Sequence, residues 1–153
     1  MSGTVESKLA SLGITVPVAT APAANYVPTV ISGNQLWVSG QISIADGKLI
    51  TGKLGVDTDI DAGKAAARQC AINIIAQIKA ALGDLDRVTR VVKLSGFVNS
   101  APDFVDQPKV VNGASDLFVE AFGDAGRHAR SAVGVAALPF GVAVEVEAVV
   151  EFA

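Results

Sequence analysis

A few charged residues stand in two apolar stretches near the C-terminus and are the residues best suited to chemistry. Arg130 opens the stretch 130–135, and Glu145 and Glu147 lie within the stretch 144–152. Both stretches alternate their side chains with period two, which is typical of β-strands. A charge in a largely apolar sheet is costly unless it is paired or meets a ligand, so Arg130 and Glu145 form the candidate functional pair. A simple cross-strand ion pair is the alternative interpretation.

The two stretches are separated by the segment Leu138-Pro139-Phe140-Gly141, whose proline and glycine break the strand pattern. If this segment is a hairpin connection, antiparallel pairing brings Arg130 opposite residues 145–148. The arginine and at least one glutamate would then share a face of the sheet. This hairpin is an expectation from spacing alone.

Length and composition predict one domain and an oligomer. The chain has 153 residues, enough for a single core, and 50% of them are hydrophobic. Only 18% are charged, against a usual share of about a quarter, so the surface is short of polar cover. The net charge of −3 with scattered basic residues argues against a nucleic-acid partner. One cysteine and one histidine cannot build a Cys/His zinc site, so no metal is expected.

The N-terminal part predicts neither a membrane span nor a secretion signal. No charged side chain occurs from Ile14 to Ala45, yet prolines and glycines interrupt this region, so it cannot be one membrane helix. The first residues lack a basic start followed by an apolar core. The cytoplasm is therefore the expected location.

The order of predicted elements indicates an α+β fold. Residues 1–24 are interpreted as an N-terminal extension with a short helix, and residues 25–153 as the domain. Within the domain, periodicity and turn residues predict strands 26–31 and 35–44, helix 59–82, strand 88–98, helix 108–122 and the final hairpin. This ββαβαββ order places both helices on one face of a mixed sheet. Packing of subunits would cover the other face, and a homotrimer is the hypothesis.

Several short motifs, in this order and spacing, resemble the RidA family, also called YjgF or L-PSP proteins. They are Ser39-Gly40-Gln41, Gly96-Phe97-Val98, Asn112, Ala129-Arg130-Ser131-Ala132-Val133, Leu138-Pro139 and Val144-Glu145-Val146-Glu147-Ala148. The resemblance runs from about Tyr26 to Phe152. It implies a chorismate-mutase-like fold, a trimer with a ligand site in each cleft between subunits, and hydrolysis of 2-imino or enamine acids to 2-oxo acids and ammonia without a cofactor.

The resemblance also assigns roles to individual residues. It makes Arg130 the group that binds the substrate carboxylate, and Glu145 the group that activates water. The pocket lining that it implies consists of Tyr26, Ser39, Gly40, Asn112 and the backbone of Ala132. The expected partners are small 2-imino or 2-oxo carboxylic acids.

The sequence departs from the family pattern in places, and two other functions stay open. His128 stands where many members have proline, and it is interpreted as a loop residue without an identifiable partner. Ala132 replaces a frequent cysteine, and residues 1–24 are longer than the typical start. The first alternative is a trimeric protein that binds small carboxylates without turnover. RNA cleavage, attached to some relatives by name, ranks last because no acid/base histidine pair exists.

Overall fold

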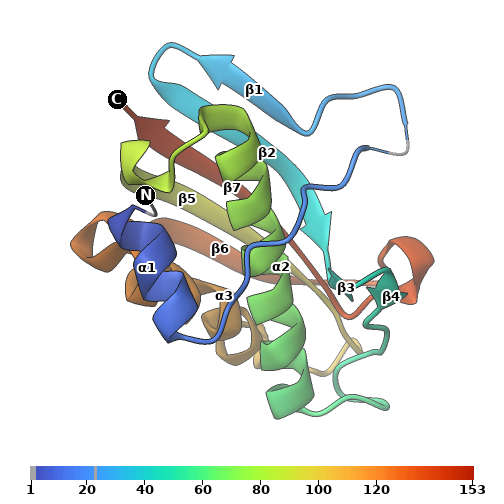
Figure 1. Cartoon of the computed structure of the whole chain (residues 1–153). Helices are drawn as coiled ribbons and strands as arrows, with labels where there is room; N and C mark the ends of the chain where they lie inside the picture. Colours follow the sequence, from blue (N-terminus) through green and yellow to red (C-terminus); the bar gives the residue numbers. More distant parts are fainter. Residues whose placement is uncertain (1–2, 23) are drawn as a thin grey trace.

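The computed structural model describes residues 3–22 and 24–153 (Figure 1). Residues 1, 2 and 23 of the expected N-terminal extension lie outside this range. The helices are α1 (Thr4–Ser11), α2 (Ile60–Leu82) and α3 (Gln107–Phe122), with 3₁₀ turns η1 (Leu85–Arg87), η2 (Gly123–Gly126) and η3 (Pro139–Gly141). The strands are β1 (Thr29–Ser32), β2 (Gln35–Ile42), β3 (Ile44–Ala45), β4 (Lys48–Leu49), β5 (Val88–Asn99), β6 (Ala129–Val135) and β7 (Val144–Phe152).

Five strands form one mixed sheet in the order β1-β2-β7-β5-β6, and β3 and β4 make a separate small hairpin. Strands β5 and β6 are parallel, whereas the other neighbours in the sheet are antiparallel. Figure 1 shows the helices gathered on one face of this sheet. The predicted α+β fold is therefore confirmed. The other face, called the open face below, is not covered by any helix of the described chain.

Helix α2 begins at a side-chain cap, because Asp59 accepts a hydrogen bond from the backbone N–H of Ala62 at 2.8 Å.

Helix α3 packs closely on α2 and on the sheet because glycines stand at both contacts. In α3, a Cβ at Gly113 would lie 2.1 Å from the carbonyl oxygen of Lys64 in α2. A Cβ at Gly96 of β5 would lie 2.6 Å from a methyl group of Val111. These positions hold α3 close to both α2 and β5, which fixes the helix face that carries Asn112.

The expected hairpin between the last two strands is wrong. Strand β6 pairs in parallel with β5, and β7 lies between β2 and β5. The connecting segment forms the turn η3, and Val142 then makes a bridge to Thr51. The chain thus crosses to the centre of the sheet instead of turning back beside β6. β7, whose alternate side chains are buried, takes a central position with neighbours on both sides, and the more exposed β6 becomes an edge strand.

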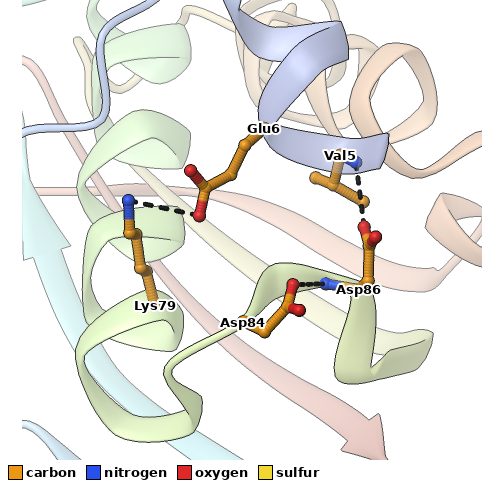
Figure 2. Close-up of polar contacts among 5 residues, drawn as sticks. All are labelled: Val5, Glu6, Lys79, Asp84 and Asp86. Atoms are coloured by element: carbon orange, nitrogen blue, oxygen red, sulfur yellow. Dashed lines mark hydrogen bonds and ion pairs between the residues drawn. The ribbon is translucent and has the colours of Figure 1, made fainter. Parts of the chain in front are cut away.

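The N-terminal segment docks onto the domain through α1 (Figure 2). The Asp86 carboxylate accepts hydrogen bonds from the backbone N–H groups of Thr4 at 2.8 Å and Val5 at 2.9 Å, which caps the helix from another element. Glu6 forms an ion pair with Lys79 of α2 at 3.2 Å. The side chains of Val5 and Leu9 are buried in the core. The boundary predicted at residue 24 stays a prediction.

Candidate active site

The Arg130 side chain extends from edge strand β6 toward α3. Its Nη1 donates to Asn112 Oδ1 at 2.8 Å and to Ser115 Oγ at 3.0 Å. Its Nη2 donates to the carbonyl oxygen of Pro108 at 3.2 Å. Arg130 and Asn112, predicted from the sequence to belong to one site, are thus in direct contact. Ala132 lies on the same face of β6, because it pairs with Gly96, which faces α3.

The positive charge of Arg130 is held by neutral oxygen atoms alone. Within residues 3–22 and 24–153, the ion pairs of side chains involve Arg68, Lys79, Lys109 and Arg127 as cations, and Arg130 is not among them. A guanidinium carries five N–H donors, and three are used in the bonds to Asn112, Ser115 and Pro108. Two donors and a full positive charge therefore remain for a ligand. Such a group is well suited to a carboxylate.

Glu145 lies on the open face of the sheet. Its neighbours Val144 and Val146 are fully buried toward the helices, so strand alternation directs Glu145 to the opposite side. The carboxylate packs beside Gly40, where a Cβ would lie 3.0 Å from Glu145 Cδ. Burial, and then the charge of Glu147, raise the pKa of Glu145 above its ordinary value. A carboxyl group with a raised pKa is suited to proton transfer near neutral pH.

A cavity of about 310 Å³, here named the Glu145 cavity, opens beside this carboxylate. Tyr26 and Gly40 line it, so the structure brings together three of the predicted site residues. Ser39 neighbours Gly40 in β2, and its hydroxyl donates to the carbonyl oxygen of Val27 at 2.8 Å. The remaining walls are mostly apolar, with Pro22, Pro28, Ile42, Ile44, Pro139 and Phe140 among them.

The predicted site falls into two groups on opposite faces of the sheet. Arg130 contacts α3 on the helix face, whereas Glu145 lies on the open face, and β5 separates the strands that carry them. The expectation that both would share a face is therefore wrong for a single copy of the chain. It failed because it depended on the hairpin that does not form.

Three residues near these groups were missed or misread from the sequence. His128 lies in the loop just before β6, as expected, but it has partners, because its ring nitrogens lie 2.7 Å from the Gly126 carbonyl oxygen and 2.8 Å from Ser115 Oγ. Ser115 follows Asn112 by three residues, and this spacing in a helix could have indicated a shared face. Phe140 lines the Glu145 cavity with a left-handed backbone (φ 59°), for which the sequence gives no signal.

The described residues contain neither a cluster suited to a metal ion nor a helix suited to crossing a membrane. No cluster of three or more His, Cys, Asp or Glu side chains suited to a metal ion occurs among residues 3–22 and 24–153. In the same part of the chain, no helix combines the length and the apolar character needed to cross a bilayer.

Comparisons with known proteins give close relatives over almost the whole chain. The chain is 59% identical to Protein TCP17 of Trypanosoma cruzi over 152 residues, which cover 98% of the chain and 95% of the relative. A crystal structure of the protein Atu1372 from Agrobacterium tumefaciens, described as having unknown function, has a TM-score of 0.92 at 52% identity. That match covers 98% of this chain and 93% of the other.

More distant relatives have names that point to small acids. A 2-iminobutanoate/2-iminopropanoate deaminase of Dermatophagoides farinae is 30% identical and covers 90% of this chain and 93% of the relative. A structure of Escherichia coli TdcF with bound serine has a TM-score of 0.63 at 27% identity, and the match covers 88% of this chain and 94% of the other. The model of the YjgF/chorismate mutase-like family, whose description also names an endoribonuclease, matches residues 6–151. The chain therefore belongs to the YjgF/chorismate mutase-like family, the family of the RidA and L-PSP proteins.

Proposed function

We propose that this protein hydrolyses reactive 2-imino or enamine acids to 2-oxo acids and ammonia, at clefts shared between copies of the chain. Arg130 of one copy holds the substrate carboxylate, and Glu145 of a neighbouring copy activates the water. The assembly is a homotrimer. The single observation that carries this proposal is the positive charge of Arg130, which is held by neutral oxygens and keeps two donors free.

Arg130 is suited to fixing a 2-imino acid in place. A planar guanidinium forms parallel hydrogen bonds to both oxygens of a carboxylate, and this fork also orients the adjacent imine carbon. Asn112 and Pro108 hold the guanidinium from the α3 side without neutralising it. Because the imine carbon is already electrophilic, its hydrolysis requires only that the substrate is oriented and that one acid/base group transfers protons.

Glu145 is suited to the proton transfers of the reaction. Its carboxylate takes a proton from water while the water oxygen bonds to the imine carbon, giving a tetrahedral carbinolamine. The same group returns this proton to nitrogen. The carboxylate then takes the hydroxyl proton of the carbinolamine and passes it to the nitrogen as the C=O double bond forms and the C–N bond breaks, and the products are a 2-oxo acid and ammonia. The raised pKa of Glu145, caused by burial and by Glu147, brings the acid and base forms closer to balance at neutral pH.

The separation of the two groups within one copy favours a site built from two copies. Arg130 contacts α3 on the helix face from edge strand β6, whereas Glu145 projects from the open face and lines the Glu145 cavity. That face carries exposed apolar side chains, with Val30 and Trp37 each 52% exposed and Val133 45% exposed. An apolar face of this kind favours association. Contact between two different surface regions forms a closed ring when its rotation closes, and three copies is the number that the family resemblance implies.

The test is a direct assay with freshly generated 2-iminobutanoate and 2-iminopropanoate. The wild-type protein should form the 2-oxo acids faster than buffer, and both Arg130→Ala and Glu145→Gln should lose this activity. Arg127→Ala is the matched control, since Arg127 is an exposed arginine that pairs with Asp124. A wild-type rate equal to buffer, or one unchanged by Arg130→Ala, would reject the proposal.

A second candidate is a protein that binds small carboxylates without turnover. The structure of the relative with bound serine favours it, because serine has a carboxylate and no imine. Calorimetry that detects binding of 2-oxobutanoate by a protein without deaminase activity would support this candidate over the first.

A further inference from the structure

A chain of hydrogen bonds connects Arg130 to the core of the protein through two residues with no assigned role. Ser115 Oγ lies 3.0 Å from Arg130 Nη1 and 2.8 Å from His128 Nε2. The other ring nitrogen of His128, Nδ1, lies 2.7 Å from the carbonyl oxygen of Gly126. The path therefore runs from Gly126 through His128 and Ser115 to the guanidinium.

The direction of each hydrogen bond follows from which groups can donate. An arginine only donates, so Ser115 Oγ accepts from Arg130 and its own hydrogen is available for His128 Nε2. A carbonyl only accepts, so His128 Nδ1 carries the hydrogen toward Gly126. All three bonds are satisfied together when the imidazole is neutral with its hydrogen on Nδ1. Burial, together with the nearby charge of Arg130, lowers the pKa of His128, which favours this neutral form.

The far end of this path is rigid. The His128 ring packs edge-on against the ring of Phe118, with centroids 6.3 Å apart, and Phe118 is fully buried. Gly126 sits so close to α3 that a Cβ would lie 2.1 Å from the Phe118 carbonyl oxygen. The acceptor for His128 Nδ1 is thus fixed by the backbone, and the ring cannot shift without breaking core contacts.

We infer that His128 and Ser115 are positioning residues that hold Nη1 of Arg130, so that its remaining N–H donors stay ready for a substrate carboxylate. The two residues touch neither substrate nor reacting atoms in this account. The inference rests on the role proposed for Arg130, but the order that it predicts for the guanidinium is measurable without ligand or turnover.

Two neutral substitutions of His128 separate positioning from packing. In Gln, the amide reaches the position of Nε2 and can accept from Ser115, whereas the shorter Asn reaches only the position of Nδ1. Both lose the ring that packs on Phe118, so His128→Gln and His128→Asn form a matched pair. Ser115→Ala removes the link itself.

The first measurement is nitrogen NMR of the folded protein at pH 7. The chain has one histidine, so its ring signals are unambiguous, and we expect the neutral form with the hydrogen on Nδ1. The Arg130 Nε–Hε signal, identified by its loss in Arg130→Lys, should have a high order parameter in wild type and His128→Gln. It should be clearly lower in His128→Asn and Ser115→Ala. A charged ring, a hydrogen on Nε2, or equal Arg130 order in all variants would overturn the inference.

The second measurement is the dissociation constant of 2-oxobutanoate by calorimetry. We expect it to rise about tenfold in His128→Asn and Ser115→Ala, the effect of losing one hydrogen bond to a charged group, and to stay within about twofold in His128→Gln. Equal losses in both His128 variants would contradict positioning. If wild type binds no carboxylate while Arg130 order follows the expected pattern, the proposed function fails and the positioning inference is upheld.

Discussion

Arg130 and Glu145 lie on opposite faces of one sheet, and β5 separates the strands that carry them. In a 2-imino acid the imine carbon is bonded directly to the carboxylate carbon. When Arg130 binds that carboxylate, the imine carbon therefore lies close to the guanidinium. The Glu145 of the same copy cannot reach that carbon around the sheet. An enzyme that uses both residues must therefore take them from different copies of the chain.

The first prediction concerns the planar hydrogen-bond donors of the Arg130 guanidinium. Arg130→Ala should weaken binding of 2-oxobutanoate about 10- to 100-fold, because charged hydrogen bonds are lost. Arg130→Lys keeps the charge but loses the planar pair of donors, so its affinity should lie between wild type and Arg130→Ala. Calorimetry at constant salt measures these constants. A lysine variant that binds as tightly as wild type would indicate that charge alone suffices.

The second prediction concerns the pH dependence of Glu145. Glu145→Gln should lower kcat about 10²- to 10⁴-fold with little change in KM. Because the pKa of Glu145 is raised, wild-type activity should fall on acidification at a higher pH than an ordinary glutamate would give. Glu147→Gln removes one cause of this rise, so it should keep activity and shift the acidic limb to lower pH. An unshifted limb in Glu147→Gln would contradict the assignment.

The third prediction concerns the stability cost of Glu145. A glutamate whose folded pKa is raised contributes stability below its unfolded pKa, and this contribution is lost as pH rises through the folded pKa. At pH 7 the charged form is therefore disfavoured in the folded state. Glu145→Gln should therefore unfold at an equal or higher denaturant concentration than wild type at pH 7. A clear loss of stability would show that the carboxylate is needed for the fold.

The fourth prediction concerns the open face. Trp37→Glu puts a charge on this face in β2 and should reduce the mass measured by light scattering toward that of a single chain. Ile31→Glu is the matched control. Ile31 is 57% exposed against 52% for Trp37, but it pairs with the buried Leu36 and so lies on the other face. Equal effects of both variants would argue against an interface on the open face.

Much of the fold could be predicted from the sequence because its signals are local. Asp59 and Gly83 mark the ends of α2, and the turn 32–34 joins β1 to β2 as expected. The predicted pairing of the last two strands was wrong. A segment with proline and glycine shows where a strand ends, but it does not show which strand the next one pairs with. The strand order depends on the burial of β7, which is a property of the whole sheet.

The structure brings some of the predicted site residues together, but not all of them on one face of the sheet. Arg130 meets Asn112, and Tyr26 and Gly40 line the Glu145 cavity. Their division between two faces could not be predicted, because it follows from the strand order. His128 lacked a visible partner because Ser115 and Gly126 approach it only when α3 and β6 are packed together.

The central claim is that each active site takes Arg130 and Glu145 from different copies. Arg130→Ala and Glu145→Gln proteins are unfolded together in equal amounts, refolded and assayed with 2-iminobutanoate. If the site is shared, about a quarter of the clefts in a random ring receive both intact residues, so activity should return to about a quarter of the wild-type level. If both residues act within one copy, every site lacks one of them. Activity no higher than that of the separate variants would then contradict the account.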